Sequence, residues 1–148
     1  MTEVTFYDWI LECDVEATRE TYQKVLQGSA ETCDCIYCKN FLALRDELFQ
    51  GEFLKLLNNL GVDYRKDVEI YHKATLEKGK HLYAGWFHSI GKVKQNGNVV
   101  ILKNELQVYF MQNKDLMFDE FEGKDLLQIE FDNVVLPWIL ADLPEPKQ

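Results

Sequence analysis

The spacing of the apolar residues changes between residues 63 and 67, and this change limits the fold more than any other feature of the sequence. Before it, apolar side chains recur at steps of three and four, as in Tyr37, Phe41, Leu44 and Leu48, which is the period of an amphipathic helix. After it, β-branched and aromatic residues alternate with polar ones between turn signals, which is typical of strands. Helices followed by consecutive strands predict an α+β fold, with N-terminal helices packed on a mainly antiparallel β-sheet.

Three helices are predicted in the first half of the chain. The first spans residues 15–27, because Asp14 is a good N-cap and Gly28 follows the last apolar residue. The second spans residues 36–49. The third lies in "EFLKLLNNLGV", where Gly61 and Val62 form a C-terminal cap with its hydrophobic contact.

Strands are predicted in six later or flanking segments: "VTFYDWILE", "DVEIYHKAT", "GKHLYAGWFHSIGKV", "VVILK", "ELQVYFMQ" and "LLQIEFDNVVL". The long third segment is one strand or a pair, bent at Gly85 or Gly91. The dipeptide Asn96-Gly97 predicts a tight hairpin turn that leads into "VVILK". Pro137 is expected to stop the last strand.

The length of 148 residues fits a single domain over residues 1–148, which can bury roughly 70% of its unfolded surface without a covalent staple. The N-terminus has neither a basic start nor a cleavable apolar core, and no apolar run approaches the roughly 20 residues that span a bilayer. We therefore expect a soluble cytoplasmic protein without a membrane partner. In that compartment the four cysteines are expected to stay out of permanent disulfides.

The formal net charge of −9 argues against a general nucleic-acid surface, because phosphate binding needs clustered Lys and Arg. The stretch from residue 64 to 103 is nevertheless basic and contains all three histidines. It predicts either solvated lysines at a sheet rim or a local surface that attracts anions. The expected partner is an unidentified protein or small molecule.

The segment "ETCDCIYCKNF" gathers Cys33, Cys35 and Cys38 at the start of the second predicted helix. The positive end of a helix favours thiolates, and the thiolate is both the metal ligand and the nucleophile. C-x2-C is a common half of a zinc site, and Cys33 adds a third ligand. We name His88 as the fourth, from a set of candidates that also includes Cys13, His72 and His81. A second C-x2-C or H-x3-H pair, which would strengthen the prediction, does not occur.

Three other interpretations of the cysteines stay open. Cys35 and Cys38 form a C-x-x-C pair at a helix start, which is typical of redox motifs, although the β-α-β context is missing. One thiol activated by a histidine would give a nucleophilic site. Alternatively the cysteines only pack beneath the helix start, with Asp34 as its cap.

A second notable segment is "HLYAGWFHSIG", residues 81–91. We predict a ligand pocket lined by Tyr83, Trp86 and His88, with Gly85 allowing a backbone to approach closely. The alternative is that Trp86 and its neighbour Phe87 are core residues on the two sides of a covered strand.

Six blocks of the sequence together resemble a family of small bacterial proteins of unknown function: "DVEATRETY", "CDCIYCKNF", "LLNNLGVD", "VEIYHKA", "HLYAGWFHSIG" and "VLPWIL". The resemblance covers most of the chain, and C-x-C-x2-C-x-N-F followed by G-W-F-H is its most specific part. It implies no reaction, ligand or catalytic residue, so it assigns no role to the cysteines or to His88.

The sequence contains no complete catalytic motif such as a phosphate-cradling loop, H-E-x-x-H or G-x-S-x-G. We therefore expect a binding or interaction module that presents the cysteine cluster at a helix N-terminus, rather than an enzyme. The alternative is a metal- or thiol-dependent enzyme that uses the cysteines and a nearby histidine.

Overall fold

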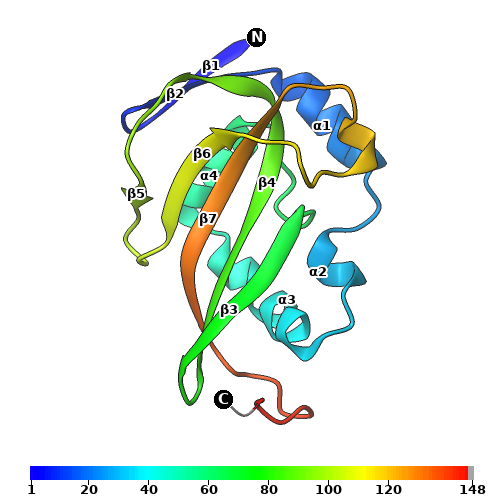
Figure 1. Ribbon diagram of the computed structural model, residues 1–148, viewed down its shortest axis with the longest axis vertical. Helices are drawn as coiled ribbons and strands as arrows, with labels where there is room; N and C mark the ends of the chain where they lie inside the picture. The colour runs from blue at the N-terminus through cyan, green and yellow to red at the C-terminus, as the bar shows by residue number, and fades with distance from the viewer. Residues whose placement is uncertain (147–148) are drawn as a thin grey trace.

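The computed structural model describes residues 1–146 and places helices behind a seven-stranded antiparallel sheet, which confirms the α+β prediction (Figure 1). The helices are α1 (Val15–Lys24), α2 (Ser29–Thr32), α3 (Ile36–Leu48), α4 (Gly51–Asn59) and the 3-10 turn η1 (Asp119–Phe121). The strands are β1 (Thr2–Phe6), β2 (Trp9–Cys13), β3 (Glu69–Glu77), β4 (Lys80–Gln95), β5 (Val100–Ile101), β6 (Gln107–Gln112) and β7 (Leu126–Pro137).

Strand β4 is the centre of the sheet. Its whole first part pairs with β7 on one side, and the strand order is β1-β2-β4-β7-β6-β5. On its other side β4 pairs first with β3, over Lys80–Trp86, and then with β2, over Gly91–Gln95. Figure 1 shows β4 and β7 side by side along the length of the molecule. Because β4 is a single strand, the predicted bend at a glycine does not divide it.

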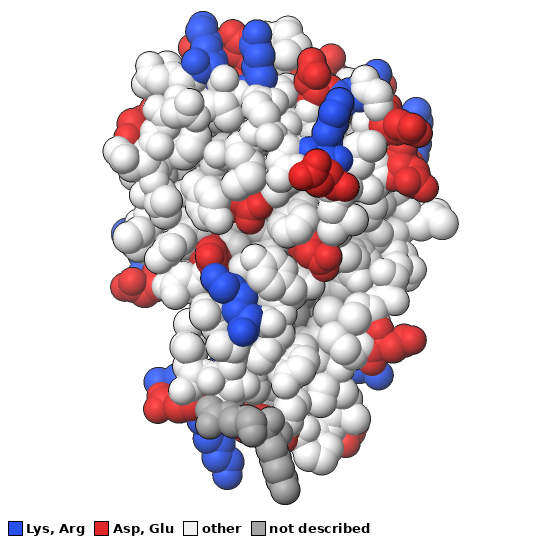
Figure 2. All heavy atoms as spheres, in the orientation of Figure 1, with Lys and Arg blue, Asp and Glu red and all other residues white. Residues whose placement is uncertain are grey.

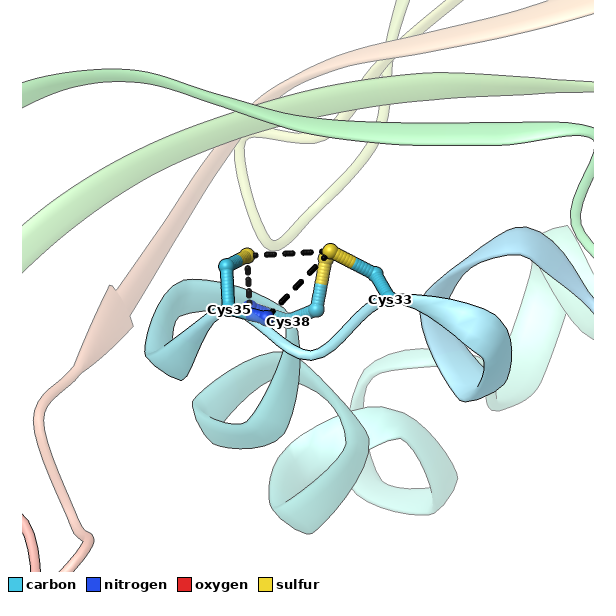
Figure 3. Close-up of side chains that lie close together, drawn as sticks. All are labelled: Cys33, Cys35 and Cys38. Atoms are coloured by element: carbon cyan, nitrogen blue, oxygen red, sulfur yellow. Dashed lines mark hydrogen bonds between the residues drawn. The ribbon is translucent and has the colours of Figure 1, made fainter.

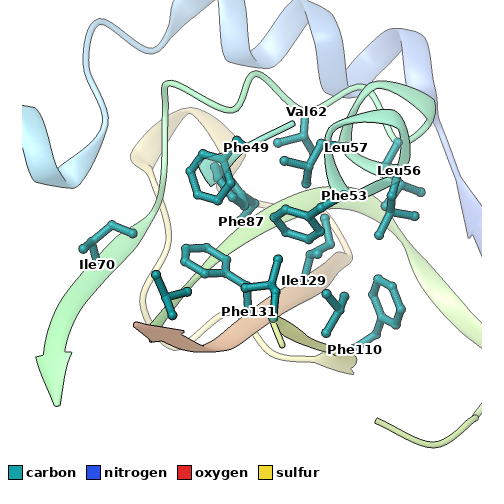
Figure 4. Close-up of a cluster of buried hydrophobic side chains, with 14 of the residues drawn as sticks. Phe49, Phe53, Leu56, Leu57, Val62, Ile70, Phe87, Phe110, Ile129 and Phe131 are labelled. Carbon is teal, nitrogen blue, oxygen red and sulfur yellow. The ribbon is translucent and has the colours of Figure 1, made fainter. Parts of the chain in front are cut away.

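The core fills the space between α4, the end of α3 and the sheet (Figure 4). Phe49 follows α3 and packs edge-on against Phe87 of β4 and Phe131 of β7, at ring centroid distances of 5.6 and 5.4 Å. Phe53 of α4 packs against Phe131 at 5.9 Å. Such aromatic pairs add directional contacts to the burial of apolar surface, so they fix how the helices lie on the sheet.

The helix caps follow the sequence closely. Asp14 caps α1, since its side chain accepts a hydrogen bond from the Ala17 N–H. At the end of α4, Gly61 has φ +80° and the Val62 N–H donates to the Leu57 carbonyl, which is the predicted cap. The first helix ends at Lys24 rather than at residue 27. Val25 is buried in an extended conformation there, and the short helix α2, which the sequence analysis missed, follows.

One strand prediction and one turn prediction were wrong. The N-terminal segment is not one strand, because Tyr7 adopts φ +54° and a turn separates β1 from β2. The Asn96-Gly97 dipeptide does not form a hairpin, since β5 pairs with β6 and not with β4. The reason is a distant contact: the Asn98 backbone N–H and side-chain amide both donate to the carboxylate of Asp8 in the first turn.

Charged side chains are scattered over the face seen in Figure 2, where acidic and basic groups alternate and no continuous basic surface forms. Several surface lysines are paired with carboxylates, for example Lys73 with Asp132 at 3.0 Å. Among residues 1–146, no helix combines the length and apolar character needed to span a bilayer.

Candidate functional site

The cysteine cluster lies at the junction of α2 and α3, and a buried carboxylate fixes the first of these helices. Asp67, which precedes β3, accepts hydrogen bonds from the Ser29 hydroxyl at 2.5 Å and from the Ala30 N–H at 3.1 Å. The Ser29 N–H donates to the Asp67 carbonyl as well. A helix of four residues has little stability of its own, so this anchor sets where the chain enters the cluster.

Cys33 ends α2, and Cys35 begins α3. The Cys33 N–H donates to the Ser29 carbonyl as the C-cap of α2. Cys35 is the N-cap of α3, where its Sγ accepts a hydrogen bond from the Cys38 N–H at 3.4 Å. The cap is therefore a thiol and not the carboxylate of Asp34. This geometry turns the side chains of Cys35 and Cys38 to one side of the first helical turn.

The three sulfur atoms lie within 4.8 Å of one another (Figure 3). The Cys33 and Cys35 sulfurs are 3.2 Å apart, and the Cys35 N–H is 3.5 Å from the Cys33 sulfur. Cys33 and Cys35 are exposed, whereas Cys38 is buried. The cluster thus has an inner thiol that faces the protein and two outer thiols that solutes can reach.

The surroundings shift the pKa values of Cys35 and Cys38 in opposite directions. Partial burial acts to raise the pKa of Cys35, but hydrogen bonds from the Cys38 N–H and the neighbouring thiols outweigh it and hold that pKa below its ordinary value. Burial raises the pKa of Cys38, and the adjacent Cys33 and Cys35 raise it further. Cys35 therefore ionises before Cys38, which makes it a suitable ligand or nucleophile.

Tyr83 of β4 contacts the first turns of α3, the helix that begins at the cluster. It is fully buried, its hydroxyl donates to the Tyr37 carbonyl at 2.8 Å, and its ring lies against Phe41 of α3. Burial raises the pKa of Tyr83, and the nearby Cys38 and Cys35 add to that rise. Tyr83 thus stays a neutral phenol beside the sulfurs.

The donor set fits a thiophilic metal ion. Zinc–sulfur bonds of about 2.3 Å in a tetrahedral site place ligand sulfurs about 3.8 Å apart, and the three sulfurs need only small side-chain rotations to reach that spacing. Over the described part of the chain, no histidine or carboxylate joins the three cysteines in this group. The protein itself therefore supplies three ligands and leaves one position open.

The predicted fourth ligand, His88, and the alternative candidate Cys13 lie away from the cluster. Cys13 is buried in β2 beside Ser89, and burial raises the pKa of its thiol to about 11. His88 is buried too, and its Nε2 pairs with the Gln128 side chain at 3.0 Å. The prediction that His88 completes the metal site is corrected, because its side chain leaves the sheet on the face opposite to the cysteines.

The predicted pocket of Tyr83, Trp86 and His88 is corrected for the same reason. Tyr83 points toward α3, whereas Trp86 contacts Tyr71 of β3 on the other face at a centroid distance of 6.3 Å. Successive side chains of a strand alternate between its two faces, so residues 83 and 86 lie on opposite faces of a regular strand. The pairing of β4 with β7 is irregular between Tyr83 and Gly85, but Tyr83 and Trp86 still contact different partners.

One arrangement was not predicted from the sequence: His72 of β3 and His81 of β4 face each other. His72 Nε2 and His81 Nδ1 are 2.9 Å apart, and the Tyr37 ring stacks on His72 at 3.8 Å. A short β3–β4 turn at Gly79 was a signal that these residues could meet. The irregular register of the hairpin was not visible in the sequence.

No family model, curated protein or solved structure matches the chain. The site is therefore interpreted from its own geometry, and the resemblance of the sequence blocks stays a prediction.

Proposed function

We propose that this protein is a binding module that holds one zinc ion through Cys33, Cys35 and Cys38. The observation that carries the proposal is the mutual approach of the three sulfurs within 4.8 Å at the start of a 13-residue helix. Thiolates select soft and borderline ions, and zinc is the commonest such ion in sites that include a C-x2-C pair.

The surroundings support thiolate ligands. Backbone N–H groups of Cys35 and Cys38 already point at sulfur atoms, and such donors stabilise the negative charge that metal ligation requires. Because Cys33 and Cys35 are exposed, the fourth position faces solvent. Water or a donor atom of a small-molecule or protein partner fills it, which joins metal binding to partner binding in one site.

Metal ligation would also join α2 to α3. The two helices are already linked by the ion pair of Glu31 with Arg45 at 2.7 Å, and Cys33 and Cys38 lie on the two sides of the short connection between them. Since a structural metal site contributes its binding free energy to folding, loss of the ion should loosen this corner first. The four free cysteines support a reducing compartment, and we place the protein in the cytoplasm on that basis.

A cobalt(II) titration under reducing conditions tests the proposal, because thiolate–cobalt charge transfer and the visible bands of tetrahedral cobalt report the ligand type. Cys35→Ser and Cys38→Ser are expected to abolish the thiolate bands, whereas the control Cys13→Ala should retain them. Zinc should then displace cobalt at a ratio of one per chain. Equal spectra for all variants would overturn the proposal.

A second candidate function is that of a thiol-dependent enzyme, in which Cys35 acts as the nucleophile. Cys35 is exposed and has a lowered pKa, and the Cys33 sulfur is 3.2 Å away as a resolving partner. Rates of alkylation by iodoacetamide as a function of pH test this. Selective modification of Cys35 in the metal-free protein with an apparent pKa below that of free cysteine supports it, and equal slow rates at Cys33 and Cys35 contradict it.

A further inference from the structure

The β3–β4 hairpin carries a second group of metal-ligating side chains, separate from the thiols. His72 Nε2 and His81 Nδ1 lie 2.9 Å apart, with the two rings tilted by 47°. We infer that these two nitrogens form a bidentate site for a borderline divalent cation such as Zn²⁺, Ni²⁺ or Cu²⁺. Neutral imidazole is the preferred protein ligand of these three ions.

A β-bulge places the two histidines. In the β3–β4 pairing His72 is opposite Tyr83, but the register shifts before Ala74, and Thr75 is then opposite His81. The extra residue in β3 increases the local twist and turns the His72 ring toward His81. Bulges of this kind often re-aim a side chain near a functional site.

A carboxylate orients the inner histidine. His81 is fully buried, and its Nε2 donates to Glu145 Oε1 at 2.8 Å. The Gly79 N–H donates to the same oxygen at 2.7 Å. The Glu145 oxygen thus accepts from two donors, and one of them is His81 Nε2. With its proton on Nε2, His81 directs the lone pair of Nδ1 at His72.

This chain of carboxylate, histidine and open lone pair is the arrangement that surrounds metal-bound histidines in proteins. Glu145 already orients His81, so the metal-free and metal-bound pairs differ only in the atom between the two rings. In the metal-free protein that atom is the proton on His72 Nε2. On binding, His72 takes its proton on Nδ1 instead, so the neutral pair exchanges a hydrogen bond for two metal–nitrogen bonds with no net loss of a proton.

The two rings are held in position for this exchange. Tyr37 stacks on His72 at 3.8 Å and 22°, and Trp138 lies 5.2 Å from His81. Metal–nitrogen bonds of about 2.0–2.1 Å in a tetrahedral site require nitrogens about 3.3 Å apart, slightly more than the distance in the hydrogen-bonded pair. The Thr75 hydroxyl is 3.4 Å from His81 Nδ1, which puts an oxygen beside the ion or its bound water.

The histidine pair stands independently of the thiol cluster, although Tyr37 lies between Cys35 and Cys38 in the sequence and touches His72. The test therefore uses the full chain with Cys33, Cys35 and Cys38 replaced by serine, so that thiol binding cannot contribute. Isothermal titration with Ni²⁺ and Zn²⁺ should show one site. His72→Gln should abolish it, and Glu145→Gln should weaken it by about 10- to 100-fold.

Glu77→Gln is the matched control, because Glu77 is an exposed carboxylate in the same hairpin that pairs with Lys80, and binding should not change. If the triple serine variant does not fold, imidazole ¹H–¹⁵N spectra of the zinc-saturated wild type replace it. A further equivalent of Zn²⁺ should then shift the nitrogens of His72 and His81 but not of His88. Absence of binding, or equal affinity with and without His72, would overturn the inference without affecting the proposal for the cysteines.

Discussion

The Tyr22 hydroxyl of α1 takes the place of a strand beside His88, because it donates to the His88 carbonyl at 2.6 Å and accepts from the His88 N–H at 3.1 Å. On this edge of β4 the pairing with β3 ends at Trp86, and the pairing with β2 begins at Gly91. One phenol thus satisfies both backbone groups of His88, while Thr18 and Asp14 of the same segment bind the N–H and the carbonyl of Ile90. Buried backbone groups without partners are costly, so this contact joins α1 to the sheet.

Tyr22→Phe tests that role. The variant keeps the buried ring but leaves an N–H and a carbonyl of β4 without a partner, so we expect a loss of about 2–3 kcal/mol in the free energy of unfolding, measured by urea denaturation. Tyr7→Phe is the control, since the Tyr7 hydroxyl donates to Glu52 at the surface and its loss should cost less than about 0.5 kcal/mol. Equal effects of the two substitutions would contradict this interpretation.

Gly91→Ala tests the close approach of β2 to β4. A Cβ at residue 91 would lie 2.0 Å from the Glu12 carbonyl oxygen, so the two strands would have to separate. We expect the variant to lose about 1–3 kcal/mol of stability in thermal or urea unfolding. The neighbouring substitution Lys92→Ala changes an exposed side chain and should stay within about 0.5 kcal/mol of the wild type. A stable Gly91→Ala variant would show that β2 can move without cost.

Glu130→Gln tests the cost of a buried carboxylate. Burial raises the pKa of Glu130 above its unfolded value, although the Gln128 side-chain amide donates to it. A raised folded-state pKa means that wild-type stability falls as the pH rises from the unfolded value through the folded value. The glutamine variant keeps an acceptor for Gln128 and carries no charge. Its stability relative to the wild type should therefore increase between pH 4 and pH 7.

Melting temperatures measured across that pH range check this prediction. Glu122→Gln, at an exposed position in the loop before β7, is the control and should show a constant difference from the wild type. A Glu130→Gln variant whose relative stability does not change with pH would mean that the carboxylate is as well solvated in the folded state as in the unfolded state.

Local features of the sequence predicted α1, α3 and α4, although not the short helix α2. The caps at Asp14 and Gly61 depend on residues within one turn, so propensity and spacing were sufficient. The Asn96-Gly97 hairpin failed for the opposite reason. Its conformation is decided by Asp8, which is about 90 residues away in the sequence and binds Asn98 with three hydrogen bonds. A local turn motif predicts the backbone conformation only where no residue distant in the sequence forms competing hydrogen bonds with it.

In the candidate site, too, local contacts could be predicted from the sequence and long-range contacts could not. Cys33, Cys35 and Cys38 meet because they lie within six residues at a helix start, which the sequence shows directly. The missed pairing of His72 with His81 comes from strand register, whereas His88 was chosen because the sequence does not show which face of β4 lies toward the cysteines. A shift of one residue moves a side chain to the other face of the sheet, and the bulge that sets this register has no recognisable sequence pattern.

The most direct test of the account is the zinc content of the protein purified under reducing conditions without chelator, measured by elemental analysis against protein concentration. We expect about one tightly held zinc ion per chain in the wild type and in Cys13→Ala. We expect little or none in Cys35→Ser or Cys38→Ser, and a lower melting temperature for the metal-free wild type. Wild-type protein that folds, has reduced thiols and retains no zinc after incubation with excess metal would contradict it.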